Sequence, residues 1–172
     1  MGSMQTGTSL SPQYHVRLAT ADDTDALVRL INAAFIVEKP IIEGDRVNAE
    51  RLAALFAIGK FLLLEENSQL VSCVYIEIKS PQRGYLGLLA VDPSRQKSGL
   101  GRRMIEAAES FLKDAGCDFA DLRIVNARAE LQPIYERLGY SATGIAPIPD
   151  TIPLKIPSHF TMMSKNLRKT IS

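Results

Sequence analysis

Apolar residues recur along the chain with two periods, which predict where helices and strands lie. A spacing of three and four residues marks one face of a helix, and a spacing of two marks one face of a strand. Helical spacing covers residues 20–35, 48–58, 99–116 and 129–139. Strand-like runs cover residues 14–19, 60–66, 69–78, 84–91, 118–125, 140–146 and 159–167.

Turn and breaker residues sharpen several of these boundaries. Gly59 follows the second helical range, and Asn67-Ser68 separate two strands as the turn of a hairpin. Pro133 belongs in the first turn of a helix, so the fourth helix is expected to start near Leu131. Three prolines exclude regular structure from residues 148–157.

The order β-α-α-β-β-β-α-β-α-β-β predicts one mixed sheet with helices on both faces. The strand at 84–91, the helix after it and the strand at 118–125 should form a right-handed parallel unit. A chain of 172 residues suits one domain, which we expect at 14–168. Residues 1–13 are small and polar and are expected to be disordered, and MGSM resembles a cloning remnant before a native Met4.

Composition is that of a soluble globular protein, with 46% hydrophobic and 23% charged residues. The net charge of +1 gives no field that would attract nucleic acid or an acidic membrane surface. We expect neither secretion nor a membrane span, since no long apolar run occurs. Cys73 and Cys117 lack metal-ligand spacing and are expected to be reduced, which fits a cytoplasmic protein without a metal site.

The stretch VDPSRQKSGLGRRM, residues 91–104, places two glycines and four basic side chains before a helix. The first amides of a helix lack internal partners and favour an anion, and glycine lets a ligand approach the backbone. The stretch therefore predicts a phosphate cradle, although a solvated helix start is the simpler alternative. A P-loop string is absent, and a dinucleotide fingerprint would need glycine at Met104 and glycines directly after the strand.

Residues 88–109, LLAVDPSRQKSGLGRRMIEAAE, resemble the Gcn5-related N-acetyltransferases (GNAT family), with Gln96, Gly99 and Gly101 in the motif positions. Residues 122–140, LRIVNARAELQPIYERLGY, are similar to the second signature of that family. The resemblance implies the GNAT fold of the α/β class: a single mixed, mostly antiparallel sheet of six to seven strands with about four helices on both faces.

The resemblance also implies acetyl-CoA as the cofactor. Its pantetheine arm would add to the strand at 84–91 through the backbone of Leu89 and Val91. The amides from Lys97 to Arg102 would take the pyrophosphate. Because these roles belong to the backbone, a larger residue at Gly99 or Gly101 should weaken cofactor binding more than a side-chain substitution at Lys97 or Ser98. The implied cofactor-binding set is Leu89, Ala90, Val91, Gln96, Lys97, Ser98, Gly99, Leu100, Gly101 and Arg102.

By the same resemblance, Tyr135 is the general acid that faces the sulfur, and the amide of Leu89 polarises the thioester carbonyl. A core tyrosine is the alternative reading of Tyr135. Many family members carry an asparagine seven residues before this tyrosine. Arg128 stands there, so either Asn126 contacts the cofactor or Arg128 takes that role.

The general base is the least defined part. Some members have a glutamate on the fourth strand, where this chain has Tyr85. Glu77 on the preceding strand is our candidate, with Glu38, Glu43, His159 and a water chain as alternatives.

Family acceptors bind at segments that correspond here to residues 34–47 and 146–159. Their mixed apolar and acidic composition suits a small amine with a hydrophobic portion or a peptide terminus. The expected function is acetyl transfer from acetyl-CoA to a primary amine, and the alternative is a catalytically silent CoA-binding regulatory or interaction module. Family members often dimerise, so a homodimer is an open alternative.

Overall fold

The computed structural model of the protein describes residues 13–169. A single seven-stranded sheet has the order β1-β2-β3-β4-β5-β7-β6. The strands are β1 (Tyr14–Leu18), β2 (Lys60–Glu66), β3 (Gln69–Ile78), β4 (Arg83–Val91), β5 (Phe119–Val125), β6 (Ser141–Pro147) and β7 (His159–Asn166). The α-helices are α1 (Thr24–Ala34), α2 (Ala49–Ile58), α3 (Leu100–Asp114) and α4 (Leu131–Arg137).

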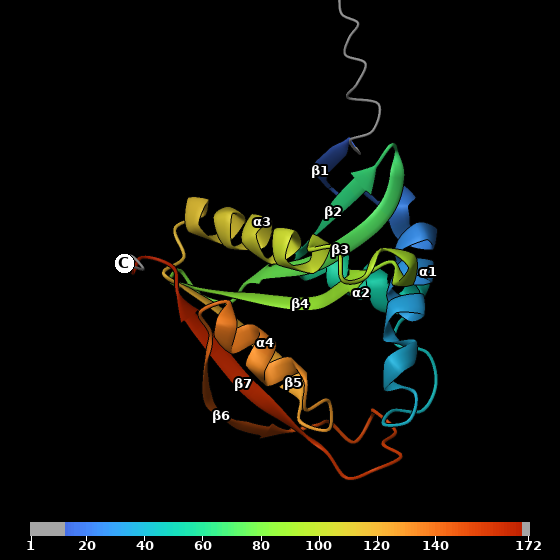
Figure 1. Ribbon diagram of the computed structural model, residues 1–172, viewed down its shortest axis with the longest axis vertical. Helices are drawn as coiled ribbons and strands as arrows, with labels where there is room; N and C mark the ends of the chain where they lie inside the picture. Colours follow the sequence, from blue (N-terminus) through green and yellow to red (C-terminus); the bar gives the residue numbers. More distant parts are fainter. Residues whose placement is uncertain (1–12, 170–172) are drawn as a thin grey trace, which may run out of the picture.

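The sheet is mixed and mostly antiparallel, which confirms the expected fold class (Figure 1). Only the pair β4–β5 is parallel, and α3 makes the connection between these two strands. The parallel unit expected at 84–125 is therefore present.

Helices cover both faces of the sheet because its central strands are apolar on both sides. In β2, Leu62 and Leu64 pack into a core with α3, while Phe61 and Leu63 pack into a second core with α1 and α2. The partly buried residues of α4 join the first core. Thus α3 and α4 lie on one face, and α1 and α2 lie on the other.

Two helix boundaries differ from their prediction. The range 20–35 is not one regular helix: a 3-10 turn at Ala21–Asp23 precedes α1, and a second at Phe35–Glu38 follows it. Thr20 caps the first turn, since its hydroxyl accepts from the Asp22 amide. Gly59 ends α2 as predicted, in an extended conformation.

Both cysteines are free and fully buried, as expected. Within residues 13–169, none of the helices combines the length and apolarity needed to cross a bilayer. The prediction of a disordered N-terminal segment with a cloning remnant lies almost entirely on residues 1–12, which are outside the described part of the chain.

Candidate active site

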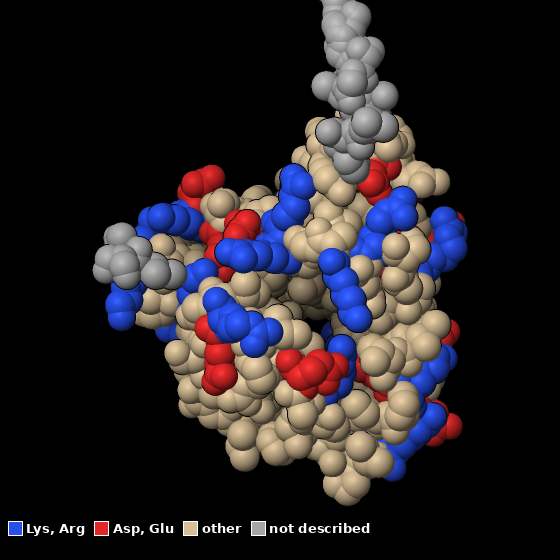
Figure 2. Space-filling model, in the orientation of Figure 1, with Lys and Arg blue, Asp and Glu red and all other residues tan. Residues whose placement is uncertain are grey.

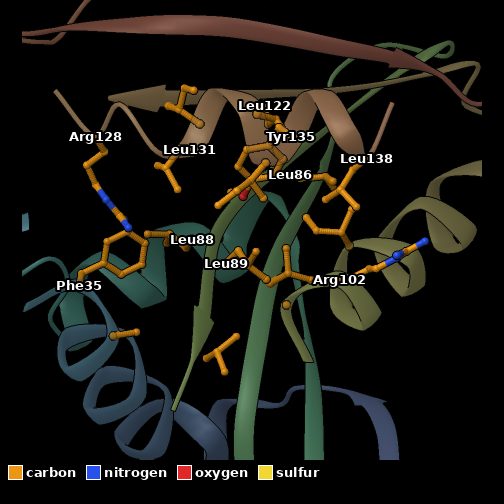
Figure 3. A pocket seen from close by; sticks show the side chains of 18 of the residues that line it. Phe35, Leu86, Leu88, Leu89, Arg102, Leu122, Arg128, Leu131, Tyr135 and Leu138 are labelled. Carbon is orange, nitrogen blue, oxygen red and sulfur yellow. The ribbon is translucent and has the colours of Figure 1, made fainter. Parts of the chain in front are cut away.

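A pocket with a volume of about 980 Å³ opens where β4 and β5 separate. The two strands pair only at Arg83–Tyr85 and Phe119–Asp121, and they diverge beyond these residues (Figure 1). Residues from β4, β5, α3, α4 and the 3-10 turn after α1 line the space (Figure 3). This volume lies at the upper end of the range for small-molecule sites.

A bulge in β4 helps to open this pocket. Cys73 of β3 faces Ala90, whereas Tyr75 faces Gly87, so β4 has one residue more than β3 between these pairs. Leu88 takes up the extra length with a φ of 49°. Such a bulge bends the strand and increases its twist. It turns the end of β4 away from β5.

The end of β4 presents free backbone groups to the pocket. The Asp92 amide donates to the Val71 carbonyl at 2.8 Å, on the side of β3. Amides alternate sides along an antiparallel strand, so the amides of Val91 and Leu89 face the open side. These are the two residues expected to bind a pantetheine arm. The Gln96 side chain approaches the same edge, with its Nε2 atom 3.5 Å from the Val91 carbonyl.

The turn between β4 and α3 is a concave run of amides. The Asp92 carboxylate accepts from the Ser94 amide at 2.8 Å and starts the turn. Lys97 and Gly99 then adopt left-handed conformations, with φ values of 66° and 84°. Within residues 13–169, the amides of Lys97, Ser98 and Gly99 donate no hydrogen bond. The next three amides open α3, where a helix leaves its donors free. The turn therefore offers consecutive donors to an anion.

Gly101 keeps the floor of this turn open. A Cβ atom at this position would lie 3.7 Å from Val91 Cγ2 and 3.9 Å from Leu89 Cδ2. Both distances are ordinary contacts, so the protein itself has room for a methyl group. That group would stand in the space between the turn and the free edge of β4, where the pyrophosphate and pantetheine are expected.

Three of the four basic residues predicted at this turn line the pocket: Arg95, Lys97 and Arg102. Arg95 is paired with Glu66, and Arg102 is paired with Glu106 at 3.2 Å. Arg103 is not a lining residue, because its guanidinium stacks on the Tyr14 ring, 4.5 Å from the centroid.

Tyr135 projects from α4 over the middle of the pocket, near Leu86 and Leu89 (Figure 3). Its ring meets the Tyr140 ring edge-on, with 5.9 Å between centroids. Burial raises the pKa of the Tyr135 phenol to about 12, so the group keeps its proton at neutral pH. None of the hydrogen bonds within the described residues uses this hydroxyl. A half-buried phenol that faces the pocket is available as a proton donor.

Four predicted site residues do not line the pocket with their side chains. Ala90 is buried in the second core, where its carbonyl accepts from the Ser72 hydroxyl at 2.8 Å. The Ser98 hydroxyl donates back to the Arg95 carbonyl. Asn126 and Glu77 are also outside the lining. The pocket does collect Leu89, Val91, Gln96, Lys97, Gly99, Leu100, Gly101, Arg102 and Tyr135.

Glu77 is committed to neighbours away from the pocket. It accepts from the Tyr75 hydroxyl at 2.8 Å and pairs with Lys79 at 2.9 Å. Burial raises the pKa of the Glu77 carboxyl, but the hydrogen bonds from Lys79 and Tyr75 outweigh it and hold the pKa below its ordinary value. Such a carboxylate is a weak base, and the structure does not bring it to the reaction site.

Asn126 extends the pairing between β5 and β7. Its side-chain oxygen accepts from the His159 amide at 2.7 Å, and its amide donates to the His159 carbonyl at 3.0 Å. Arg128, which stands seven residues before Tyr135, is the residue of this loop that reaches the pocket.

The two segments expected to form the acceptor site pack against each other. Ile42 bridges to Leu154, and the Lys155 amide donates to the Ile41 carbonyl at 2.7 Å. Ile41, Val125, Ile148 and Phe160 form a small third core behind them. Of these segments, 34–47 reaches the pocket, with Ala34, Phe35, Val37, Glu38 and Arg46.

Sequence reasoning missed two arginines of this end. Arg46 and Arg123 both line the pocket. Arg123 is a charged residue between the apolar Leu122 and Ile124 of β5, which was a usable signal. Arg46 lies in a loop of mixed charge and gave no local signal.

The comparisons with known proteins agree with this geometry. The family described as "Acetyltransferase (GNAT) domain" matches residues 44–153. The mycothiol acetyltransferase of Amycolatopsis mediterranei is 27% identical over 129 residues, which cover 69% of this chain and 43% of the relative. The mycothiol acetyltransferase of Propionibacterium freudenreichii is 26% identical, over 70% of this chain and 40% of the relative. The chain thus spans about two fifths of these curated relatives.

Solved structures show the same fold. The ribosomal-protein-S18-alanine N-acetyltransferase of Escherichia coli superposes with a TM-score of 0.72 at 16% identity, covering 93% of this chain and 97% of that one. A putative acetyltransferase of Salmonella typhimurium, solved with its cofactor acetyl-CoA, has a TM-score of 0.71 at 19% identity, with coverages of 92% and 96%.

Proposed function

Because this chain belongs to the GNAT acetyltransferase family, we propose that it transfers the acetyl group of acetyl-CoA to a primary amine of a small molecule or peptide, by direct attack in a ternary complex. One observation carries the proposal. The free edge of β4, the unpartnered amides of the turn before α3 and the Tyr135 phenol all meet in one pocket.

The residues present fit coenzyme A. The amides from Lys97 to Arg102 would hold the pyrophosphate, with Lys97 and Arg102 adding positive charge. Leu89 and Val91 would pair with the pantetheine arm as an added strand would. The space beside Gly101, which a Cβ atom would enter, is left free for this ligand.

Bound acetyl-CoA supplies an activated acyl carbon and a thiolate leaving group. The Leu89 amide offers a hydrogen bond to the carbonyl oxygen as negative charge develops on it. The Tyr135 hydroxyl holds a proton for the departing sulfur, and its raised pKa keeps that proton in place until then. Glu38 is the single carboxylate among the described lining residues, and it is paired with Arg128. We therefore assign the proton lost by the amine to water rather than to a carboxylate base.

A thiol-release assay tests the proposal. Release of free coenzyme A that depends on an added amine supports it. Tight binding of acetyl-CoA without amine-dependent release would favour the silent CoA-binding module. Calorimetry with coenzyme A that shows no binding at millimolar concentration would overturn both readings.

A further inference from the structure

Positive charge dominates the lining of the pocket. Seven cationic side chains line it against one carboxylate: Arg46, Arg95, Lys97, Arg102, Arg123, Arg128 and Arg137 against Glu38. Figure 2 shows a hollow near the middle of one face, with Lys and Arg side chains around it and acidic side chains at its lower edge. Arg95, Lys97 and Arg102 belong to the turn expected to hold the pyrophosphate. The other arginines need a different explanation.

Arg46, Arg123 and Arg128 form the set that we call the acceptor-side arginines. Arg128 and Phe35 lie at one end of the pocket and Arg102 at the other, with Tyr135 between them (Figure 3). The only carboxylate partner of this set within the lining is Glu38, which pairs with Arg128 at 3.2 Å. Arg46 and Arg123 have no ion pair among the described residues.

Arg46 is the most confined of the three. Its Nε atom is buried and has no hydrogen-bond partner, and its guanidinium lies over the Phe35 ring, 5.4 Å from the centroid. Burial holds the pKa of this guanidinium below its ordinary value, and Glu38 offsets part of that effect. A desolvated charge without a partner destabilises a protein. Because Arg46 lies at the wall of a pocket, an anion bound beside the outer nitrogens of its guanidinium would offset this cost.

The backbone holds Arg46 toward the pocket. The Asn32 side chain of α1 makes two hydrogen bonds of 2.9 Å to the amide and carbonyl of Val47. This double contact fixes the loop directly after Arg46. With its backbone anchored, Arg46 has less conformational freedom to lose when it binds an anion.

Arg123 is held by aromatic rings rather than by a carboxylate. Its guanidinium lies 4.5 Å from the Phe160 centroid and 5.7 Å from the Tyr85 centroid. Stacking leaves the edge of the guanidinium, with its N–H donors, free for a planar acceptor such as a carboxylate.

We propose that the acceptor is a small amine that carries an anionic oxygen group, foremost a carboxylate, and that Arg46 and Arg123 bind this group while the amine faces Tyr135. The inference rests on the proposed acetyl transfer and names its substrate class. Polycationic acceptors such as lysine-rich peptides are disfavoured, because they would face this end with like charge. Nearby cations also favour the neutral form of the amine, which is the form that attacks.

Matched acceptors test the inference in the thiol-release assay. A panel of α- and ω-amino acids is compared with the carboxamide and the decarboxylated amine of each, and aminophosphonate analogues show whether the site prefers carboxylate or phosphonate. We expect kcat/KM to be about tenfold or more higher for the acidic acceptors. Equal or better turnover of the carboxamides and decarboxylated amines, which lack the acid group, would overturn the inference while leaving acetyl transfer intact. Failure of every amine would instead count against the proposed function.

Arg46→Met gives the matched variant, with Arg29→Met on the exposed side of α1 as its control. We expect Arg46→Met to raise KM for acidic acceptors about tenfold or more and to erase the preference for acid over amide. KM for acetyl-CoA should stay unchanged in both variants. Arg123→Met repeats the test at an exposed side chain, should Arg46→Met fold poorly. An unaltered acid preference in Arg123→Met and in folded Arg46→Met would refute the assignment.

Discussion

Glu38 and Arg128 stand ninety residues apart in the sequence and form a largely buried ion pair, with 3.2 Å between Oε2 and Nη1. The pair joins the 3-10 turn after α1 to the loop before α4. It thereby closes one end of the pocket and ties together the two faces of the sheet.

Removing either partner of this pair should destabilise the fold, but by different amounts. Arg128→Met leaves a carboxylate that is only 7% exposed without a partner, so we expect a loss of about 3 kcal/mol. Glu38→Gln should cost about 1–2 kcal/mol, because Arg128 keeps Glu130 at 3.0 Å. Denaturant unfolding measures both. Glu130→Gln is the control, and a loss there as large as in Arg128→Met would show that the buried pair is not the cause.

Gly101→Ala should separate ligand binding from stability. The methyl group meets only ordinary contacts in the protein, and alanine favours a helix over glycine by about 0.5–1 kcal/mol. The unfolding temperature should therefore hold or rise, while affinity for coenzyme A falls about tenfold or more through lost contacts to the phosphates. Gly144→Ala in β6, where a Cβ atom would meet no other atom within 4 Å, is the control for both measurements. Undiminished affinity in Gly101→Ala would remove the pyrophosphate from this turn.

Tyr135→Phe should lower kcat about tenfold or more and leave coenzyme A affinity nearly intact, because it removes a proton donor and little contact area. Steady-state rates and calorimetry give the two quantities. Tyr140→Phe is the comparison, since that hydroxyl donates to Glu109 at 2.8 Å instead of facing the pocket. It should lose stability and keep turnover. Wild-type turnover in Tyr135→Phe would exclude the phenol from the reaction.

Asp23 should make stability depend on pH in the acid range. Two hydrogen bonds of 2.8 and 2.9 Å from Arg17 hold the pKa of this carboxyl below its ordinary value of 3.8. A group whose pKa is lowered on folding stabilises the protein above its unfolded pKa, and this contribution disappears as the pH falls through the lowered value. Asp23→Asn should thus cost about 1 kcal/mol at neutral pH and much less well below pH 3.8. Unfolding curves at both pH values check this, and a cost independent of pH would contradict it.

The sequence predicted those turns and helix boundaries that depend on residues close together in the chain. The hairpin of β2 and β3 appeared through Asn67-Ser68, both of which adopt left-handed conformations, with φ values of 51° and 71°. The late start of α4 followed from Pro133 and agrees with its first residue, Leu131. The turn before α3 was visible because glycine and basic residues lie next to each other in the chain.

Features that depend on long-range packing were not predictable in this way. The sequence placed Glu77 on β3, but the packing of the helices on each face decides which side of that strand reaches the pocket. Asn126 pairs with His159, 33 residues away, through the register of β5 and β7. The loop directly after Arg46 is fixed by Asn32, which bonds to Val47 fifteen residues later, and no residue near Arg46 indicates this contact.

The bulge at Leu88 leaves the sheet with a seam. Strands β1 to β4 and strands β5 to β7 share three backbone pairings, at residues 83–85 with 119–121, and then part. A molecule bound along the seam would contact both halves of the sheet and hold them together. Its binding free energy then adds to the free energy of unfolding. The unfolding temperature of the protein should accordingly rise with the concentration of the molecule that fills the seam, so that this temperature reports how much of the protein is occupied.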